Sequence, residues 1–528
     1  MSSFIHSQEW TTFKLDVSHT GRQRGHGNLV GYEDFYWIFR TGGEVRGTPV
    51  IADLENDGRI EVIFGSMDHN LYVLNGLDGT LKWRFTSSDV IRSTPTVYDI
   101  NGDGKKEIFF TSKGAIYALN YRGSLMWVTN VVSGVPISSP TLFQRDGSYY
   151  LLAVGGPNLY CLNVLDGTLK WVKNFPDIIY STPAVGDING DEEPDIVIGC
   201  NNGDLYALSS VNGTEEWRVS FASGEYGTSG SALLYDVDGD SIDEVFVGTE
   251  AQGFYALEGK DGSVIWHIPA LGYIYSTPSI VYSDSDTLPE IVLTCGWGDS
   301  RVIVANIENG SIIWETTLTE GNPGKPSPAV ADIDGDSRDE IIVPAEGLDR
   351  VFVFNAENGD LLWKTDNIYV WWTFASPSVG DINGDGFLDI VINSDDYNVY
   401  AISKYTPIRV LIYPDQEDSI LPGQSIDYNF VVENKTLLNR IIDIDAFNSD
   451  TFFIIELLDS LGASHLYDSN GDGHVDIGVV DSEGIKNFIL RVYAPEDALY
   501  GRRDTVILRA FCADDTTIYD TAFAVTVV

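Results

Sequence analysis

Acidic residues recur along the chain with one fixed spacing, D-x-[DNE]-x-D-x-x-x-[DE]. Oxygen ligands at alternate positions of a tight loop can curl around one centre, and a carboxylate four residues further on can close it. Hard oxygens in that number suit Ca²⁺, which takes six to eight ligands at about 2.3–2.6 Å. Mg²⁺ fits less well because it prefers a small octahedron with retained water, and Zn²⁺ would need His or Cys in the cluster. The six complete copies are Asp53, Glu55, Asp57 and Glu61; Asp99, Asn101, Asp103 and Glu107; Asp187, Asn189, Asp191 and Asp195; Asp236, Asp238, Asp240 and Glu244; Asp332, Asp334, Asp336 and Glu340; and Asp381, Asn383, Asp385 and Asp389.

The alternative interpretation of these loops is a set of ordinary Asp/Asn/Gly turns at strand ends. A turn needs no acid at the ninth position, yet every complete copy has one. Without a cation, the carboxylates of one loop would repel one another by roughly 1–4 kcal/mol per pair at effective dielectric constants of about 80 to 20. We therefore expect Ca²⁺ as a structural ligand, at about six to eight sites in the chain.

Two loops keep only part of the pattern. The third repeat has lost three of its four ligand positions, so we expect no calcium there. The sixth repeat keeps three of four, and whether it binds calcium stays open. The positions concerned are Gln144, Asp146, Ser148 and Leu152 in the third repeat, and Tyr282, Asp284, Asp286 and Glu290 in the sixth.

A last copy lies in the carboxy-terminal part of the chain. Its seventh position is His474, where a backbone carbonyl normally binds, so the histidine side chain need not coordinate. We expect a further calcium site there, against the alternative of a plain turn. Its ligands would be Asp468, Asn470, Asp472 and Asp476.

The elements that would position these loops form an internal repeat marked by tryptophan. Successive members are 44 to 49 residues apart, and each unit reads as four short apolar segments separated by Gly/Asn/Asp turns. Four antiparallel strands in about 45 residues describe a propeller blade. The series is Trp37, Trp83, Trp127, Trp171, Trp217, Trp266, Trp314 and Trp363.

The two ends of the repeat array complement each other. The eighth unit has three strands but no tryptophan strand, whereas residues 34–40 are a tryptophan strand without a unit. We expect this amino-terminal strand to complete the last blade, which closes the ring and removes open sheet edges. The predicted fold is thus all-β, with a lead-in segment over residues 1–29 and an eight-bladed β-propeller over residues 30–405.

Residues 406–528 lack the tryptophan period and alternate as half-buried strands. About seven such strands in ~120 residues, separated by Pro/Gly turns, predict a β-sandwich of immunoglobulin type. The calcium loop at 468–476 would belong to this second domain.

The repeat text LYVLNGLDGTLKW, LYCLNVLDGTLKW, FYALEGKDGSVIW and VFVFNAENGDLLW resembles the quinoprotein-like (PQQ-type) propeller family. Dehydrogenases of that family often carry an adjacent Cys-Cys pair, which this sequence lacks. The acidic loops resemble the calcium loops of FG-GAP and VCBS-type repeats, a resemblance that implies extracellular placement and binding roles. Propellers host many unrelated functions, so the resemblance implies the fold more strongly than the chemistry.

Composition restricts the partners. The chain has 32 Lys and Arg against 78 Asp and Glu, a net charge of −46, which argues against nucleic acid and anionic lipid. No apolar run is long enough for membrane insertion. The first residues contain no signal peptide, so the chain is either cytosolic or has had a signal peptide removed; the calcium loops favour an extracellular or cell-surface location, where Ca²⁺ is millimolar.

Basic and aromatic residues recur seven positions before the acidic loops, on the strand that should line the channel mouth. Aromatic faces stack on sugars, and basic groups hold carboxylates or sulfates. A glycan or peptide could therefore bind there, with ordinary loop packing as the alternative. The candidates are Arg46, Arg92, Tyr180, Tyr275, Lys325 and Phe374, with Trp371 and Trp372 just upstream.

Three kinds of function are compatible with these features. The first is a secreted or cell-surface, calcium-stabilised module for binding, adhesion or assembly, with a glycan or protein ligand. The second is a carbohydrate-active enzyme such as a polysaccharide lyase, which the scarcity of histidine, seven in all, disfavours. The third is a self-associating subunit of an extracellular filament or surface layer. No G-x-S-x-G, H-E-x-x-H or Cys/His pairing occurs, so a binding protein is favoured over an enzyme.

Overall fold

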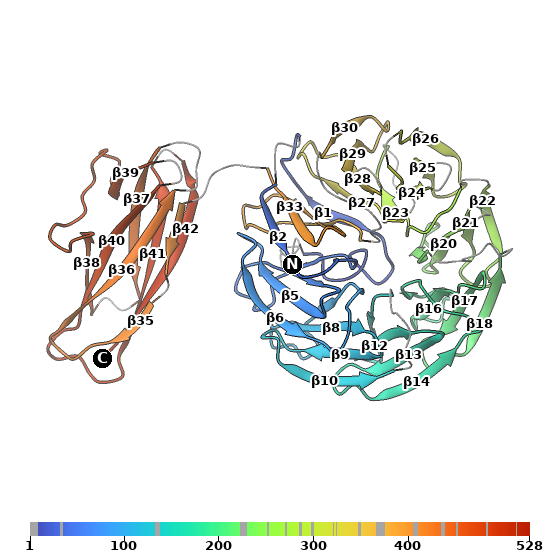
Figure 1. Ribbon diagram of the computed structural model, residues 1–528, viewed down its shortest axis with the longest axis horizontal. Helices are drawn as coiled ribbons and strands as arrows, with labels where there is room; N and C mark the ends of the chain where they lie inside the picture. Colours follow the sequence, from blue (N-terminus) through green and yellow to red (C-terminus); the bar gives the residue numbers. More distant parts are fainter. Residues whose placement is uncertain are drawn as a thin grey trace. The chain divides into compact units, whose positions relative to one another are not determined.

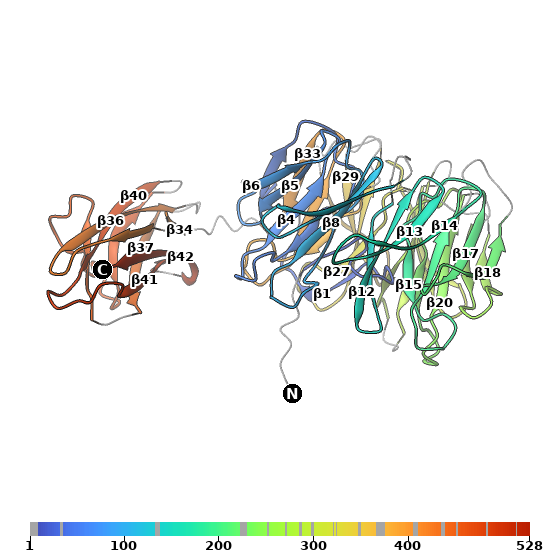
Figure 2. The same ribbon diagram turned by 90° about the horizontal axis from the view of Figure 1, so that it is seen from below.

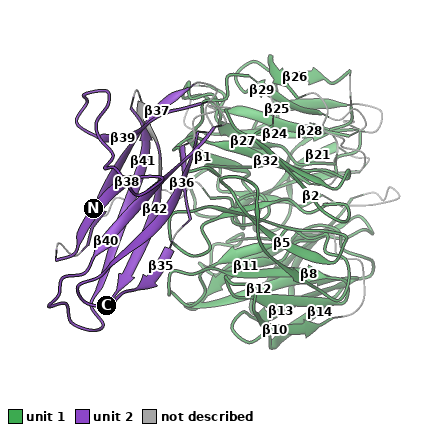
Figure 3. Ribbon diagram, turned by 60° about the vertical axis from the view of Figure 1, so that its left-hand side comes forward, with its two compact units in different colours: residues 1–404 green, residues 405–528 purple. Residues whose placement is uncertain are grey.

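The computed structural model divides the chain into two compact units, residues 1–404 and 405–528 (Figure 3). No described residue lies in a helix, and none belongs to a helical segment able to cross a membrane. The structure describes residues 9–31, 35–131, 138–221, 230–250, 253–269, 272–284, 288–296, 300–319, 321–323, 325–346, 350–365, 375–404, 410–414, 416–434, 439–449, 452–481, 484–513 and 515–528.

The described part of the first unit forms eight β-sheets arranged around a centre (Figure 1). In chain order we call them sheets 1 to 8. They comprise β3 (Val50–Ala52), β4 (Glu61–Gly65), β5 (Asn70–Asn75) and β6 (Leu81–Thr86); β7 (Thr96–Tyr98), β8 (Glu107–Ser112), β9 (Ala115–Leu119) and β10 (Leu125–Asn130); β11 (Thr141–Arg145), β12 (Ser148–Gly155), β13 (Asn158–Asn163) and β14 (Leu169–Asn174); β15 (Ala184–Gly186), β16 (Asp195–Gly199), β17 (Asp204–Ser209) and β18 (Glu215–Ser220); β19 (Leu233–Tyr235), β20 (Glu244–Thr249), β21 (Gly253–Leu257) and β22 (Val264–Ile268); β23 (Ser279–Val281), β24 (Glu290–Cys295), β25 (Arg301–Asn306) and β26 (Ile312–Thr317); β27 (Ala329–Asp332), β28 (Glu340–Ala345), β29 (Arg350–Asn355) and β30 (Leu361–Lys364); and β31 (Ser378–Gly380), β32 (Asp389–Asn393), β33 (Asn398–Ile402) and β2 (Trp37–Arg40).

Burial within each sheet follows its sequence. Most second strands, such as β4 with sequence EVIFG, are buried at every residue, whereas every residue of the outer strand β6 is half-buried or exposed. Among the described residues, seven of the eight outer tryptophans, all except Trp363, pack against a glycine in the turn of the next sheet. A Cβ on Gly79, whose φ is +69°, would lie 2.6 Å from the Trp37 ring, so this contact between neighbouring sheets requires glycine.

The amino-terminal strand completes sheet 8, as the repeat predicted. Strand β2 pairs antiparallel with β33, with Trp37 opposite Ala401. A belt of Ser and Thr near the channel also joins neighbouring sheets, because a backbone N–H of one sheet donates to a hydroxyl of the next at 2.8–3.1 Å. Among the described residues these bonds run from Thr48 to Thr94, Thr94 to Ser139, Ser139 to Thr182, Thr182 to Ser231, Thr277 to Ser327, Ser327 to Ser376 and Ser376 to Thr48.

Residues 9–29, which the sequence analysis assigned only to a lead-in segment, run along the innermost strands of the first unit. We call them the N-terminal plug. Its Trp10 bridges Ile51 of sheet 1, and its strand β1 (Arg22–His26) adds in parallel to β27 of sheet 7 (Figure 2). Between these points its carbonyls accept hydrogen bonds from the first strands of sheets 2, 4, 5, 6 and 7. The plug therefore connects sheets that are far apart in the ring.

The second unit contains two sheets that share one hydrophobic cluster. Phe430 and Phe488 of one sheet and Ile442 and Leu508 of the other lie in that cluster. Its immunoglobulin-type classification stays a prediction. In spatial order the sheets are β34 (Val410–Tyr413), β36 (Ser425–Asn434), β40 (Ile485–Tyr493) and β38 (Ile454–Asp459), and β35 (Gln416–Ser419), β42 (Asp515–Val527), β41 (Arg503–Cys512), β37 (Arg440–Asn448) and β39 (Val475–Val480).

Candidate functional site

The acidic loops form hairpins between the first and second strands of their sheets. Their curl is set by backbone hydrogen bonds: the Asp187 carboxylate accepts the N–H groups of Gly190 at 2.7 Å and Glu192 at 2.8 Å. The side-chain oxygens of Asn189 and Asp191, at the third and fifth positions, each accept the N–H group two residues on. Three hairpins bring three carboxylates within 4.8 Å of one another, close enough to hold one metal ion. These clusters are Asp187, Asp191 and Asp195; Asp236, Asp238 and Asp240; and Asp332, Asp334 and Asp336.

In the fourth and seventh hairpins, the ninth-position carboxylate has a buried oxygen that lacks a hydrogen-bond donor. Glu340 is 1% exposed; its Oε2 accepts the Ile333 N–H at 2.8 Å, but its buried Oε1 has no hydrogen-bond partner. The buried Oδ2 of Asp195 also has none. Burial raises the pKa of each carboxyl to about 8, and neighbouring acids add to the effect. A buried acceptor without a hydrogen-bond donor lowers the stability of the fold. One hard cation in each of the two hairpins would satisfy it. The donor set therefore fits a divalent metal.

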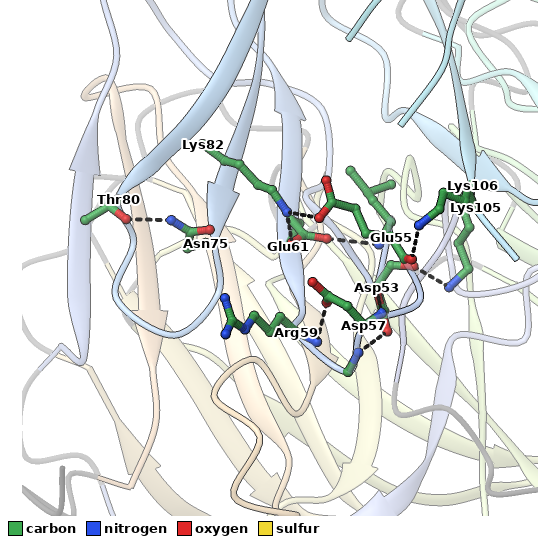
Figure 4. Close-up of polar contacts among 12 residues, drawn as sticks. Asp53, Glu55, Asp57, Arg59, Glu61, Asn75, Thr80, Lys82, Lys105 and Lys106 are labelled. Carbon is green, nitrogen blue, oxygen red and sulfur yellow. Dashed lines mark hydrogen bonds and ion pairs between the residues drawn. The ribbon is translucent and has the colours of Figure 1, made fainter. Parts of the chain in front are cut away.

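The first hairpin already contains a positive charge (Figure 4). The Lys82 ammonium lies 2.7 Å from Glu61 and 3.2 Å from Glu55, the ninth and third positions of the pattern. Lys105 and Lys106 donate to the backbone carbonyls of Glu55 and Asp53. We therefore expect this hairpin to bind calcium more weakly than the others, because the ion must displace an ammonium group.

Replacing Lys82 with Met, the residue at the equivalent place in sheet 2, should strengthen calcium binding at the first hairpin by about tenfold or more, since a charge-assisted contact no longer competes. Equilibrium dialysis at micromolar free Ca²⁺ should show up to one additional ion bound per chain. Lys170→Met is the matched control, because Lys170 has the same place in sheet 3, whose hairpin lacks the ligands. Equal binding by K82M and the unmodified chain would contradict this interpretation.

The fourth hairpin has an additional acid at the position equivalent to Lys82. The Asn189 Nδ2 lies 3.3–3.5 Å from the Glu216 carboxylate, and the Glu216 charge contributes to the raised pKa of Asp195. Lys82 and Glu216 are not among the site residues predicted from the sequence. Both directly precede a repeat tryptophan, so aligning the repeats on that residue would have shown that the outer strand reaches the hairpin.

The remaining hairpins vary. In the second and eighth, Asp99 and Asp381 accept the expected backbone N–H groups, and Asp389 is fully buried with a pKa raised mainly by burial. In the third, β11 and β12 pair up to Arg145 opposite Ser148, so the connection is a tight turn. In the sixth, the Ser283 N–H donates to Glu290 at 2.7 Å, whereas Asp286 lies outside the described residues.

Five of the predicted mouth residues line one pocket, a cavity of about 70 Å³. Beside them are hydroxyls of the Ser/Thr belt and Phe13 of the N-terminal plug. Phe374, Trp371 and Trp372 lie outside the described residues. The five that the structure brings together are Arg46, Arg92, Tyr180, Tyr275 and Lys325.

The basic groups of this pocket differ in how well they are paired. Lys325 forms a buried ion pair with Glu346 at 3.1 Å, and Arg46 contacts Glu44 at 2.7 Å. The Arg92 Nε is buried without a hydrogen-bond acceptor. Burial lowers the pKa of Arg92, and the charge of Arg46 lowers it further. Two neighbouring guanidinium groups, one of them with an unused donor, would be stabilised by an anion.

These observations define a β-propeller with acidic hairpins able to hold metal ions and a small basic pocket at its channel. The model of the family described as outer membrane protein assembly factor BamB matches residues 112–267 and 201–419. Because these residues make up more than half of the chain, the protein belongs to this family of PQQ-like propellers, and the predicted resemblance is confirmed. The FG-GAP-like repeat model matches residues 53–110, which contain the first two acidic hairpins.

Two solved structures of quinohemoprotein alcohol dehydrogenases show the same fold at low identity. Quinohemoprotein alcohol dehydrogenase ADHIIG of Pseudomonas putida HK5 is 10% identical with a TM-score of 0.54, over 75% of this chain and 80% of that one. The quinohemoprotein alcohol dehydrogenase of Comamonas testosteroni is 11% identical with a TM-score of 0.53, over 79% and 83%. BamB of Moraxella catarrhalis is 15% identical with a TM-score of 0.48, over 70% and 99%. No curated protein matches the chain by sequence.

Proposed function

We propose that the protein is a secreted or cell-surface binding module, a propeller stabilised by Ca²⁺ that receives a carboxylate of a protein partner in its channel pocket. The observation that carries the binding role is the buried, unpaired Arg92 Nε beside Arg46. A family described by an assembly factor favours a protein as the partner. The extracellular location is part of the proposal, because such loops fill at millimolar calcium.

The size of the pocket limits what can enter it. A cavity of about 70 Å³ is well below the roughly 300–1,000 Å³ of sites that enclose a whole small molecule. One acidic side chain or one terminal carboxylate fits this scale. The rest of a partner would then contact the surface around the pocket, and the bound carboxylate would fix the partner's position on that surface.

Binding of poly-L-glutamate, as a protein-like carboxylate, should weaken by about tenfold or more when Arg92 is replaced with Ala, the loss expected for a hydrogen bond between charged groups. Fluorescence anisotropy at physiological ionic strength measures it, since repulsion from the acidic surface is then screened beyond roughly 8 Å. Arg122→Ala, an exposed arginine in sheet 2, is the control and should bind normally.

Polygalacturonate serves as the second probe and distinguishes the source of the carboxylate. Tighter binding of the polysaccharide than of poly-L-glutamate would replace the protein partner with a glycan. Failure of both probes to bind at millimolar calcium, or equal binding by R92A and the unmodified chain, would reject the pocket as a carboxylate site.

A further inference from the structure

The second unit contains a buried carboxylate that no hydrogen bond satisfies. Asp443, on β37, is 0% exposed, and neither its Oδ1 nor its Oδ2 has a hydrogen-bond donor; the side chain that interacts with it is Asp472, another acid. Its neighbours Ile442 and Ile444 lie in the hydrophobic cluster of this unit. Because side chains alternate along a strand, Asp443 points to the opposite face of the sheet, away from that cluster.

The acidic loop of residues 468–476 covers this face. Asp443 is the register partner of Asp476 on β39, and the negative charges of Asp472 and Asp476 act on it directly. Like charges placed directly opposite each other in a sheet are destabilising. A fully buried carboxylate among further acids, with no donor, costs free energy unless a cation compensates it.

The other oxygens of the loop are arranged by its own backbone. Asp468 accepts the N–H groups of Gly471 at 2.5 Å and Gly473 at 2.9 Å. Asp476 accepts the N–H groups of Ser469 at 2.6 Å and Gly478 at 2.7 Å. These bonds follow the same backbone pattern as in the propeller hairpins, but no three of the described acids here lie within 4.8 Å of one another, so the ion would have to draw them together. Asp443 differs because it comes from a separate strand and lacks any such bond.

We propose that Asp443 is a ligand of a calcium ion that joins β37 to the 468–476 loop, together with Asp468, Asp472 and Asp476. The site thereby links the central part of a sheet to the loop that covers it, instead of closing a single hairpin. His474 has a separate role. Its Nδ1 lies 2.8 Å from the Asp445 carboxylate. This contact holds the loop against the same face of the sheet, two residues along β37 from Asp443.

Hydrogen exchange measured by mass spectrometry on the full chain tests this site locally. In the unmodified protein, Ca²⁺ should slow exchange at least tenfold in peptides covering residues 468–481 and 439–449, relative to the chelated protein. Asp443→Asn should abolish this calcium-dependent protection and lower the bound calcium by one ion per chain. Asp418→Asn, an exposed acid on β35 of the same sheet, is the control and should keep both the protection and the ion.

The readouts separate this proposal from the proposed function on which its calcium chemistry rests. If the propeller peptides respond to Ca²⁺ but residues 468–481 do not, the site at Asp443 is rejected and the propeller sites stand. If D443N retains the full number of ions and becomes more stable, Asp443 is a repelled acid and not a ligand. The unmodified chain alone suffices for the first comparison, so poor folding of D443N would not leave the question open.

Discussion

Removing calcium with a chelator should lower the melting temperature of the propeller unit by about 15 °C. A site held at about 100 times its dissociation constant contributes ~2.7 kcal/mol to the folded state. The three clusters within 4.8 Å would together contribute about 8 kcal/mol by the same relation. For a domain of this size, 1 kcal/mol corresponds to roughly 2 °C in melting temperature.

Calorimetry in millimolar Ca²⁺ and in excess EGTA measures this difference, and Mg²⁺ in place of Ca²⁺ tests the selectivity of the sites. The Glu340→Gln variant gives a stricter test, because its effect on the melting temperature should have opposite signs in EGTA and in Ca²⁺. In EGTA the substitution should stabilise the protein, since it removes a carboxylate that desolvation and three neighbouring acids disfavour. In Ca²⁺ it should destabilise, since a ligand is lost. Superimposable melting curves in the two buffers would reject a structural role for calcium.

The blade-level architecture could be predicted because its signals are local. A tryptophan every 44 to 49 residues marks the outer strand, and the glycine that such a ring covers is fixed by the turn beside it, as Gly79 is against Trp37. The hairpin curl likewise follows from side chains bonding to backbone groups within five residues. The missing fourth strand of sheet 8 was detectable because the same pattern supplied it at residues 34–40.

The contacts that decide the chemistry of each hairpin were not predictable by the same route. Lys82 and Glu216 have equivalent places in sheets 1 and 4 but opposite charge, and each lies more than 20 residues from the acids it affects. Asp443 lies 25 residues or more from the loop it faces, which begins at Asp468. Alternation along β37 predicts that Asp443 leaves the core, but only the tertiary structure shows that a second acidic segment covers it.

The N-terminal plug was missed because its sequence has no periodic pattern. It makes its contacts one carbonyl at a time to successive sheets, which leaves no run of apolar residues to detect. It also buries Lys14, whose ammonium donates to the Ser279 hydroxyl and the Pro328 carbonyl. Burial lowers the pKa of Lys14 to about 7. A buried lysine is uncommon, so composition alone would have placed this segment at the surface.

Acidification should weaken the plug through His19. This side chain is 1% exposed and its Nδ1 lies 2.8 Å from the Ala232 carbonyl. Burial, with a smaller contribution from the Lys14 charge, lowers the pKa of His19 from 6.5 to about 4. The unfolded chain therefore binds a proton at a higher pH than the folded chain. The stability contributed by neutral His19 is complete above pH 6.5 and is lost as the pH falls towards 4.

The expected loss is about 3 kcal/mol between pH 7 and pH 4, from a pKa difference of about 2.5 at ~1.36 kcal/mol per unit. Urea unfolding at several pH values measures it as the difference between the unmodified chain and His19→Gln, whose amide can still donate to Ala232 but cannot take up a proton. Calcium release and other carboxylates act equally on both proteins, so they cancel in this difference. His267→Gln, an exposed histidine on β22, should reproduce the acid sensitivity of the unmodified chain. If H19Q also reproduces it, His19 contributes no protonation-linked stability to the contacts of the plug.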